Sequence, residues 1–432
     1  MNDLLLTNAR IIDGSGGAPF DGDILVEDGT IAQVRPANVA AIGGDRLARV
    51  DCGGRTVMPG MVEAHCHISF DNITSFEGTI MTPVEDQALV SLKNAQLLLQ
   101  RGFTSLFSAA AAKPRLDVAV RDAIEAGHFV GPRIRACSQE ITPSGNLGDA
   151  NTNYLTLPRA IAFTVIADGA DAFTEAGRLA ARDGVDTLKV NVSGDRDYGR
   201  MHAYSTVTVI TDAELAALVA VAKPRNMMVA AHCTSSDGVK MCIRHGVDVI
   251  YHAVFADAEA RDMLEAAKDR VFVAPTIGFP WSQINRHREF GLPMPPRKLA
   301  LLQEELATLI DCMSDLRKRG VRILPGGDYG AGITNPIGTN ARDLEHFVGL
   351  LGFTPMEALV AATRLGGELM GEPERIGRLA PGAHADLLVV DGDPLDDIRI
   401  LQDPDRLSAV MIGGRFARYE MPQAPQGLRV SA

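Results

Sequence analysis

Hydrophobic and polar residues alternate in short runs at the two ends of the chain, and glycine-rich turns separate these runs. LLLTNARIID and GDILVEDGTIAQV near the start share this pattern with LLVVDGDP and LSAVMIGGRFARY near the end. Alternation with a period of two, bounded by Asp-Gly and Gly-Gly pairs, is typical of antiparallel strands. Neither end has enough strands for a domain of its own. The pattern therefore predicts one small β-sandwich domain built from residues 1–57 and 372–432.

Residues 58–371 have a different pattern, in which short apolar runs alternate with longer amphipathic stretches. Helical periodicity is clearest over residues 212–226 and 297–320. The apolar runs end near eight positions, which are His65, Phe107, Cys137, Val192, His232, His252, Pro275 and Asp328. Eight strand–helix units of this kind predict an α/β fold, a (β/α)₈ TIM barrel, with inserted loops at 138–170 and 276–296.

Composition and charge narrow the possible partners. The formal net charge is −12, which argues against binding to nucleic acid or to an anionic membrane, because both need clustered basic residues. No run approaches 18 consecutive apolar residues, so no membrane-spanning helix is expected. The sequence as given starts without a signal-peptide pattern, and its six cysteines are scattered. We therefore expect a cytoplasmic protein that acts on a small-molecule substrate.

A His-x-His pattern marks the end of the first predicted barrel strand. In an extended strand, His65 and His67 point to the same face, so that both imidazoles reach one metal ion, while Cys66 points the other way. Lys189 lies inside a buried strand, where a charged amine is costly. One interpretation of Lys189 is a buried ion pair. The other is carbamylation, in which the neutral amine captures carbon dioxide and becomes an anionic bridge between two metals.

Three further candidate site residues lie at the ends of later predicted strands. His232 and His252 each end an apolar run, 20 positions apart, at equivalent points of successive strand–helix units. Asp328 follows the eighth strand and precedes a glycine-rich loop. Taken singly, each has an ordinary explanation, as a packed core residue, a helix cap or a surface turn. Together with the His-x-His pair and the lysine, they form a far more specific pattern at the active-site end of a barrel.

This pattern resembles the amidohydrolase superfamily over nearly the whole chain. The motifs that carry the resemblance are MPGMVEAHCH at the first strand, DTLKV around the lysine, FTPMEALVAATRLGGELMG and IGRLAPGAHADLLVVDGDPLDDI. The layout is most similar to the branch that contains prolidase-like and ochratoxin-degrading amidohydrolases. The resemblance implies a centre of two divalent metal ions, zinc by ligand type. His65, His67 and Asp328 would hold the more buried ion, and His232 and His252 the outer one, with carbamylated Lys189 as the bridge.

The resemblance also implies an activity. We expect a metal-activated hydroxide to hydrolyse an amide-type C–N bond in an N-acyl amino acid, a dipeptide or a xenobiotic amide, with Asp328 as the catalytic proton carrier. One alternative is a hydrolase of xenobiotic ureas or carbamates, of the phenylurea or thiocarbamate type. A more distant alternative is a non-catalytic barrel that serves as a scaffold. By the same resemblance we expect a homo-oligomer.

Substrate contacts are predicted from two inserted segments. The segment after Lys189 offers Arg200, His202 and Tyr204, and an arginine there suits a substrate carboxylate. The alternative is a solvated polar loop. The 276–296 loop carries Trp281, which together with Phe279 and Ile284 would form an apolar wall for an aryl or alkyl group; the alternative is a buried subunit contact.

Overall fold

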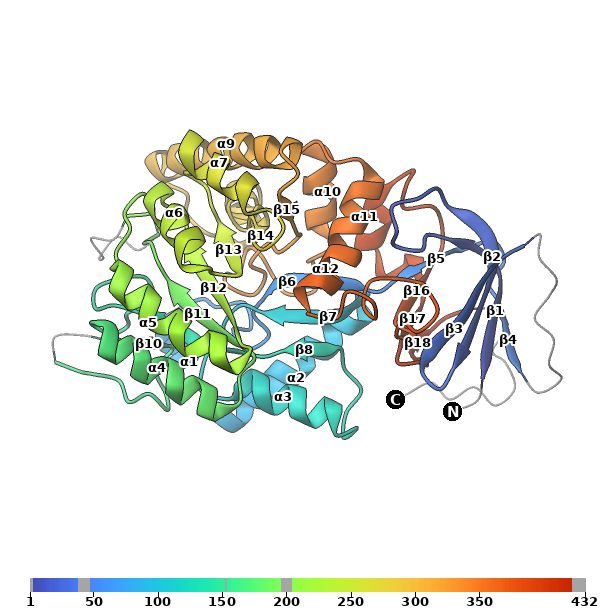
Figure 1. The fold of residues 1–432 in the computed structure, drawn as a ribbon, viewed down its shortest axis with the longest axis horizontal. Coiled ribbons are helices and arrows are strands. Elements are labelled where there is room, and N and C mark those ends of the chain that lie inside the picture. Colours follow the sequence, from blue (N-terminus) through green and yellow to red (C-terminus); the bar gives the residue numbers. More distant parts are fainter. Residues whose placement is uncertain (1–2, 38–46, 152–153, 196–203, 422–432) are drawn as a thin grey trace.

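The computed structural model describes residues 3–37, 47–151, 154–195 and 204–421. It has two parts that lie side by side, a large α/β barrel and a smaller β domain (Figure 1). Strands from the first and last described parts of the chain form the β domain, while the barrel is formed by the middle of the chain. This agrees with the change of pattern along the sequence.

The β domain is built from both ends of the chain. Its strands form one eight-stranded sheet in the order β18-β17-β16-β5-β1-β2-β3, with β4 paired to β1. The two ends of the chain meet where β16 pairs antiparallel with β5, Leu387 opposite Pro59. One apolar cluster, which includes Ile24, Val57 and Phe416, fills this domain. The strands are β1 (Leu4–Ile11), β2 (Phe20–Glu27), β3 (Thr30–Pro36), β4 (Ala48–Asp51), β5 (Thr56–Pro59), β16 (Leu387–Val390), β17 (Leu407–Ile412) and β18 (Arg415–Tyr419).

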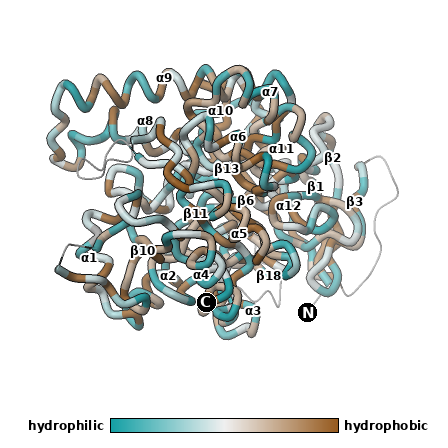
Figure 2. Tube along the Cα trace, turned by 60° about the vertical axis from the view of Figure 1, so that its left-hand side comes forward, coloured by the Kyte–Doolittle hydropathy of each residue, from teal (hydrophilic) through white to brown (hydrophobic). Residues whose placement is uncertain are grey.

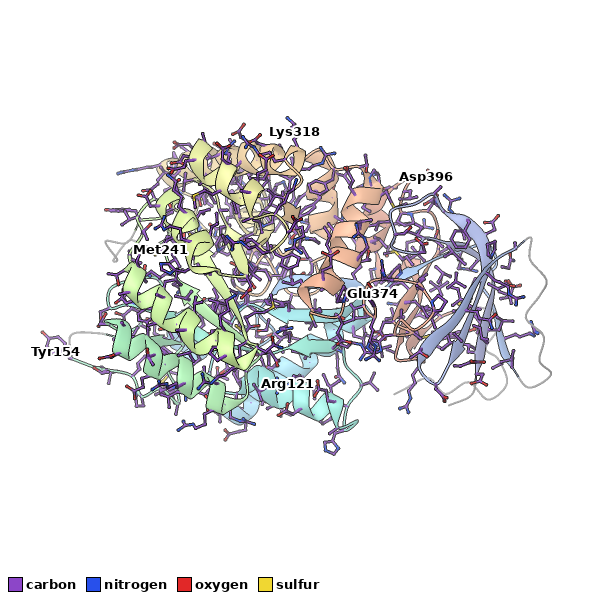
Figure 3. The ribbon with its side chains drawn as sticks, in the orientation of Figure 1. Arg121, Tyr154, Met241, Lys318, Glu374 and Asp396 are labelled. Carbon is purple, nitrogen blue, oxygen red and sulfur yellow. The ribbon has the colours of Figure 1, made fainter. Side chains whose placement is uncertain are left out.

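The predicted small β-sandwich domain is confirmed as an additional β domain built from both ends, and its strands form one continuous hydrogen-bonded sheet. The exact division at residues 57 and 372 stays a prediction. Figure 3 shows Glu374 close to the junction between the barrel and the β domain.

Parallel strands form the wall of the barrel. They are β6 (Met61–Cys66), β7 (Phe103–Ser108), β8 (Arg133–Arg135), β9 (Cys137–Thr142), β11 (Thr187–Asn191), β12 (Met228–Cys233), β13 (Val249–His252), β14 (Phe272–Ala274) and β15 (Arg322–Ile323). β8 and β9 are two parts of the third strand, separated only by Ala136. The predicted TIM-barrel fold is confirmed. The third strand continues to Thr142, beyond the predicted end near Cys137, and the short β10 (Thr164–Ile166) pairs with it.

Two contacts complete the ring of strands. The Ala64 N–H donates to the Pro325 carbonyl at 3.2 Å, which joins β6 to the segment after β15. The Ala111 N–H donates to the Ser138 carbonyl at 3.0 Å, which joins the segment after β7 to β9. The first and last strands are therefore neighbours, as a closed barrel requires.

Helices cover the outside of the barrel (Figure 1). Two of them match the strongest helical patterns in the sequence, α5 and α9, and α5 begins with a capping box in which Thr211 and Glu214 satisfy each other's backbone N–H groups. The helices are α1 (Phe76–Met81), α2 (Val84–Gln100), α3 (Leu116–Glu125), α4 (Ala170–Asp183), α5 (Asp212–Ala222), α6 (Ser236–His245), α7 (Ala258–Ala266), α8 (Gly278–Arg286), α9 (Pro296–Lys318), α10 (Arg342–Gly349), α11 (Pro355–Ala362) and α12 (Arg364–Leu369).

The barrel strands are buried on both faces, as parallel strands usually are. Along β12, Val229 and Ala231 belong to the large apolar cluster that includes the helices, whereas Ala230 belongs to a smaller cluster with Tyr251 and Phe272. Figure 2 shows hydrophobic colour along the inner strands and more hydrophilic colour on the outer turns of the helices. Among the described residues, no helix is long and apolar enough to cross a membrane. The six cysteines are buried and form no disulfide.

Candidate metal centre

The carboxyl ends of the barrel strands surround a cavity of about 440 Å³. It lies on the side of the barrel away from the β domain, since β5 leads directly into the start of β6 (Figure 1). Figure 3 shows Tyr154, from the loop after β9, projecting at this side. The lining of the cavity includes all six residues singled out as metal ligands, which are His65, His67, Lys189, His232, His252 and Asp328. The fold therefore brings the six together.

Three of these residues form a compact group. Ligand atoms of His65, His67 and Asp328 all lie within 4.8 Å of one another. Asp328 Oδ1 is 3.0 Å from His67 Nε2 and 3.5 Å from His65 Nε2. Although it is buried, this oxygen has no hydrogen bond within the described part of the chain. Close approach without hydrogen bonding is the arrangement expected of atoms that share a metal ion.

The second nitrogen of each histidine in this group is held by the protein. His65 Nδ1 lies 3.1 Å from Thr276 Oγ1, and His67 Nδ1 lies 3.3 Å from the Ala110 carbonyl. A carbonyl oxygen only accepts, so this contact suits the tautomer with the proton on Nδ1, in which Nε2 is the ligand atom. Contacts of this kind fix the orientation of metal-binding imidazoles.

Local backbone irregularities turn these side chains into the cavity. Under strict alternation Ala64 and Cys66 would share a face, yet Ala64 packs in the inner cluster and Cys66 in the outer one. The change of face falls where the register of β6 against β7 shifts, between Glu63 and Cys66. This bulge directs His65 inward, as bulges near active sites often do.

The ends of β13, β14 and β15 show a second kind of irregularity. His252, Thr276 and Asp328 have φ values of 72°, 61° and 61°, in the left-handed region that non-glycine residues seldom occupy. Such strain persists only where the surrounding structure holds it, and it gathers at functional sites. Here the left-handed backbone changes the direction of the three side chains at or after the ends of their strands.

His232 and His252 face each other at the other side of the cluster. Their ring centroids are 4.3 Å apart, and His252 is 5.6 Å from His65. His232 Nε2 lies 3.3 Å from the Gly194 carbonyl, which leaves Nδ1 for a ligand. His252 Nε2 is buried and has no hydrogen-bond partner among the described residues. A buried, unpaired imidazole nitrogen in a polar cavity fits a metal ligand.

Lys189 reaches the same cavity from β11. Its side chain is 1% exposed, and Nζ lies 4.3 Å above the ring of Tyr251. The Tyr251 ring in turn stacks on His65, with the centroids 3.8 Å apart. One aromatic ring therefore contacts both the lysine and the first histidine. Glu140, on the neighbouring strand β9, pairs in register with Lys189 and also lines the cavity.

Burial in the cluster favours the uncharged forms of the histidine and lysine side chains. Burial lowers the pKa of His65 and of His252 well below the usual value, and lowers the pKa of His232 to about 3. Burial also lowers the pKa of Lys189, while the negative charge of Glu140 opposes this shift. Neutral imidazoles bind metal ions, and a neutral amine is the form that reacts with carbon dioxide.

A buried polar network contacts the backbone near His65 and Asp328. Glu63 accepts the His65 backbone N–H at 3.2 Å and the Asn340 side-chain N–H at 2.8 Å. Asp343 accepts the Gly326 N–H at 2.9 Å, two residues before Asp328. Burial, followed by the charge of Asp343, raises the pKa of Glu63. These carboxyl groups hold the backbone of the two segments that carry the candidate ligands His65 and Asp328.

The residues predicted to contact substrate are placed differently. Phe279 and Gln283 of α8 line the cavity, but Trp281 does not. The helix turns the Trp281 ring toward α10, where it packs on His346 at 4.8 Å and beneath Arg342. Spacing along a helix explains this, since positions two apart do not share a face.

The other predicted contacts come from the segment after Lys189. Tyr204 is 61% exposed and is absent from the cavity lining. Arg200 and His202 lie outside the described residues. The sequence assigned no role to Glu140, Thr276 or His287, yet Glu140 and His287 line the cavity and Thr276 contacts His65. No local signal marks Thr276, whereas an acidic residue inside a buried strand marks Glu140.

Comparison with known proteins gives the family. Residues 56–417 match the model of the amidohydrolase family, so the chain belongs to that family, as predicted. Ochratoxinase of Aspergillus niger is 26% identical over 379 residues, which cover 83% of this chain and 75% of that protein. Among solved structures, an amidohydrolase is similar with a TM-score of 0.85 at 25% identity and covers 97% of this chain and 100% of its own.

A solved Xaa-Pro dipeptidase with methionine in its active site is similar with a TM-score of 0.81 at 24% identity, covering 96% of this chain and 99% of its own. This likeness concerns the fold. Family membership makes the protein a hydrolase, of a kind that generally binds divalent metal, and the group of His65, His67 and Asp328 is consistent with that.

Proposed function

We propose that this protein is an amidohydrolase that uses two divalent metal ions, zinc by preference, to hydrolyse an amide-type C–N bond. The observation that carries the proposal is the convergence of six predicted ligand residues on one cavity. Four imidazoles and one carboxylate suit zinc. The ions would be held by two groups, His65 with His67 and Asp328, and His232 with His252.

Lys189 is proposed to carry a carbamate that bridges the two groups. Its neutral amine would add to carbon dioxide, forming an N–C bond and releasing one proton, and the product is a carboxylate-like anion. The support is the position of Nζ in the cavity with the four histidines, at the end of a fully buried side chain. An anion there offsets part of the charge of two dications, which are costly to bury.

When bound, the ions supply a water of lowered pKa and polarise the scissile carbonyl. The chain itself supplies the proton transfer. Asp328 lies beside His65 and His67, with Oδ1 3.0 Å from His67 Nε2, and its side chain is 16% exposed. It would take the proton of the attacking water and deliver it to the leaving nitrogen, acting first as base and then as acid.

The cavity walls support an acyl or aryl group on the substrate. Three apolar side chains, Phe70, Phe163 and Phe279, line the cavity. Phe70 and Phe163 contact each other with ring centroids 4.8 Å apart. Apolar walls around a few polar groups are typical of small-molecule sites. The candidate substrates remain N-acyl amino acids, dipeptides and xenobiotic amides.

Metal analysis combined with a hydrolysis screen tests the proposal. The purified protein is expected to hold about two zinc ions per chain and to cleave members of a panel of dipeptides, N-acyl amino acids and anilides. Chelation should abolish cleavage, and zinc with bicarbonate should restore it. A chain that binds no metal, or that binds two ions and cleaves nothing in a panel widened to phenylureas and thiocarbamates, would refute the proposal and favour the scaffold interpretation.

A further inference from the structure

Glu140 is a buried carboxylate of the active-site cavity that the metal centre does not use. It is 8% exposed, comes from β9, and lines the cavity together with the six metal-centre residues. Its partner in the register of β9 and β11 is Lys189. Adjacent parallel strands lie about 4.8 Å apart, so the backbones of Glu140 and Lys189 are one strand spacing apart and both side chains line the cavity.

One oxygen of Glu140 is fixed by the protein. Asn191 Nδ2 donates to Oε2 at 2.8 Å and also contacts the Leu147 carbonyl at 3.1 Å. Gly148 packs against the same oxygen, since a Cβ at this position would lie 3.1 Å from Oε2. The carboxylate is therefore held in one orientation on the cavity wall, and a fixed buried carboxylate is an acceptor for N–H donors.

Charge decides what kind of group this acceptor would take. Buried charges in proteins are paired. The nearest cation in register is Lys189, and it becomes an anion if it carries a carbamate. The other cationic lining residue that is described, Lys298, comes from the first turn of α9. A carboxylate beside a carbamate is poorly matched with an anionic substrate group and well matched with an ammonium.

We propose that Glu140 forms an amine subsite, which selects amide substrates whose acyl part carries a free, protonated amine next to the scissile carbonyl. This inference rests on the proposed function and narrows its substrate class. The acyl side chain would lie against Leu147 and Phe163, which line the cavity and flank β9. N-terminally free dipeptides and amino-acid amides with apolar first residues fit this description, whereas N-acylated amino acids do not.

A matched substrate pair tests the subsite. L-Leucine 4-nitroanilide and its des-amino analogue, 4-methylpentanoic acid 4-nitroanilide, differ only in the amine. For wild type, kcat/KM should favour the amine-bearing substrate, and Glu140→Gln should lower that preference by about 30-fold, the scale of one charge-assisted hydrogen bond. Glu140→Gln keeps the shape of the side chain, so folding is preserved. Glu175→Gln, an exposed residue on α4, is the control and should keep the wild-type preference.

A binding measurement keeps the inference testable if neither anilide is cleaved. Calorimetry with L-leucine hydroxamate and 4-methylpentanohydroxamate should show the amine-bearing ligand binding more tightly to the metal-loaded wild type. Glu140→Gln should lose that difference while keeping the wild-type metal content. Failure to cleave any anilide or dipeptide would count against the proposed function, whereas the hydroxamate result decides the amine subsite independently.

Three outcomes would overturn the amine subsite. The first is equal handling of the amine-bearing and des-amino ligands by wild type. The second is loss of metal from Glu140→Gln, which would assign Glu140 to the metal centre. The third is a loss of preference in Asp195→Asn instead of Glu140→Gln, because Asp195 also lines the cavity and is the competing carboxylate.

Discussion

The two sides of the candidate metal centre differ in how completely the chain assembles them. His65, His67 and Asp328 already bring three ligand atoms within 4.8 Å of one another, and Thr276 and the Ala110 carbonyl hold the two imidazoles. The side with His232 and His252 has no carboxylate of its own. In the proposed function it depends on Lys189, which becomes an anionic ligand only when it carries the carbamate. The difference implies that folding alone would set one metal position, whereas the other would also require a chemical modification.

The largest expected effect comes from removing the bridge. Lys189→Ala should reduce kcat/KM by about 10³-fold or more, because metal-assisted activation of water contributes several kcal/mol to the rate. The metal content should fall from about two ions to about one, since His65, His67 and Asp328 remain. Elemental analysis and kinetics on the same sample check this. Lys93→Ala, at an exposed lysine, is the control. A variant that still holds two ions would show that both positions are set by folding.

Removing the contact between Thr276 and His65 should have a smaller effect, which is confined to the metal position of His65, His67 and Asp328. Thr276→Val removes the hydroxyl that lies 3.1 Å from His65 Nδ1. Metal affinity at this side should fall by about 10- to 100-fold, the usual cost of losing a partner that orients a ligand. Competition with a chromophoric chelator measures the affinity, and Thr276→Ser should retain it. Equal weakening by valine and serine would point to the strained backbone at φ 61° instead of the hydroxyl.

The low pKa of His232 predicts that the folding stability of the metal-free protein depends on pH. The pKa of His232 is about 3 when folded and near 6.5 when unfolded, so the unfolded chain binds more protons between these values. Stability should therefore decrease as the pH falls from about 6.5 toward 3. Burial raises the pKa of Asp117 to about 6. This group has the opposite effect, because it makes the folded protein more stable as the pH falls from about 6 to 3.8. Melting temperatures of chelator-treated protein measure the net slope, and His232→Gln should make it shallower. An unchanged slope in that variant would contradict the assignment.

The smallest effect concerns the two aromatic residues of α8. Trp281→Phe should change kcat/KM by less than about twofold, because the Trp281 ring packs on His346 outside the cavity lining. Phe279→Ala removes a side chain that lines the cavity, and should lower kcat/KM several-fold for substrates with apolar groups. Parallel kinetics on the two variants check this. A larger loss in Trp281→Phe than in Phe279→Ala would support the predicted role of Trp281.

The sequence alone determined the architecture of this protein and which candidate ligand residues meet in one cavity. Strand and helix periodicities reflect backbone geometry, so local pattern suffices for a barrel and for a β domain shared between both ends. Parallel strands of a barrel end at one face, so placing His65, Lys189, His232, His252 and Asp328 at strand ends was enough to predict their meeting.

Tertiary structure decided how those residues point and what surrounds them. The bulge between Glu63 and Cys66 and the left-handed backbone at His252 and Asp328 set side-chain directions that strict alternation would get wrong. Thr276 contacts His65, and Glu140 pairs in register with Lys189; both pairs are distant in sequence, and no local pattern encodes them. Which face of α8 meets the cavity, Phe279 or Trp281, likewise depended on how the helix packs. Periodicity records what each segment does by itself, whereas side-chain direction at a strand end is fixed by the contacts that hold a strained backbone in place.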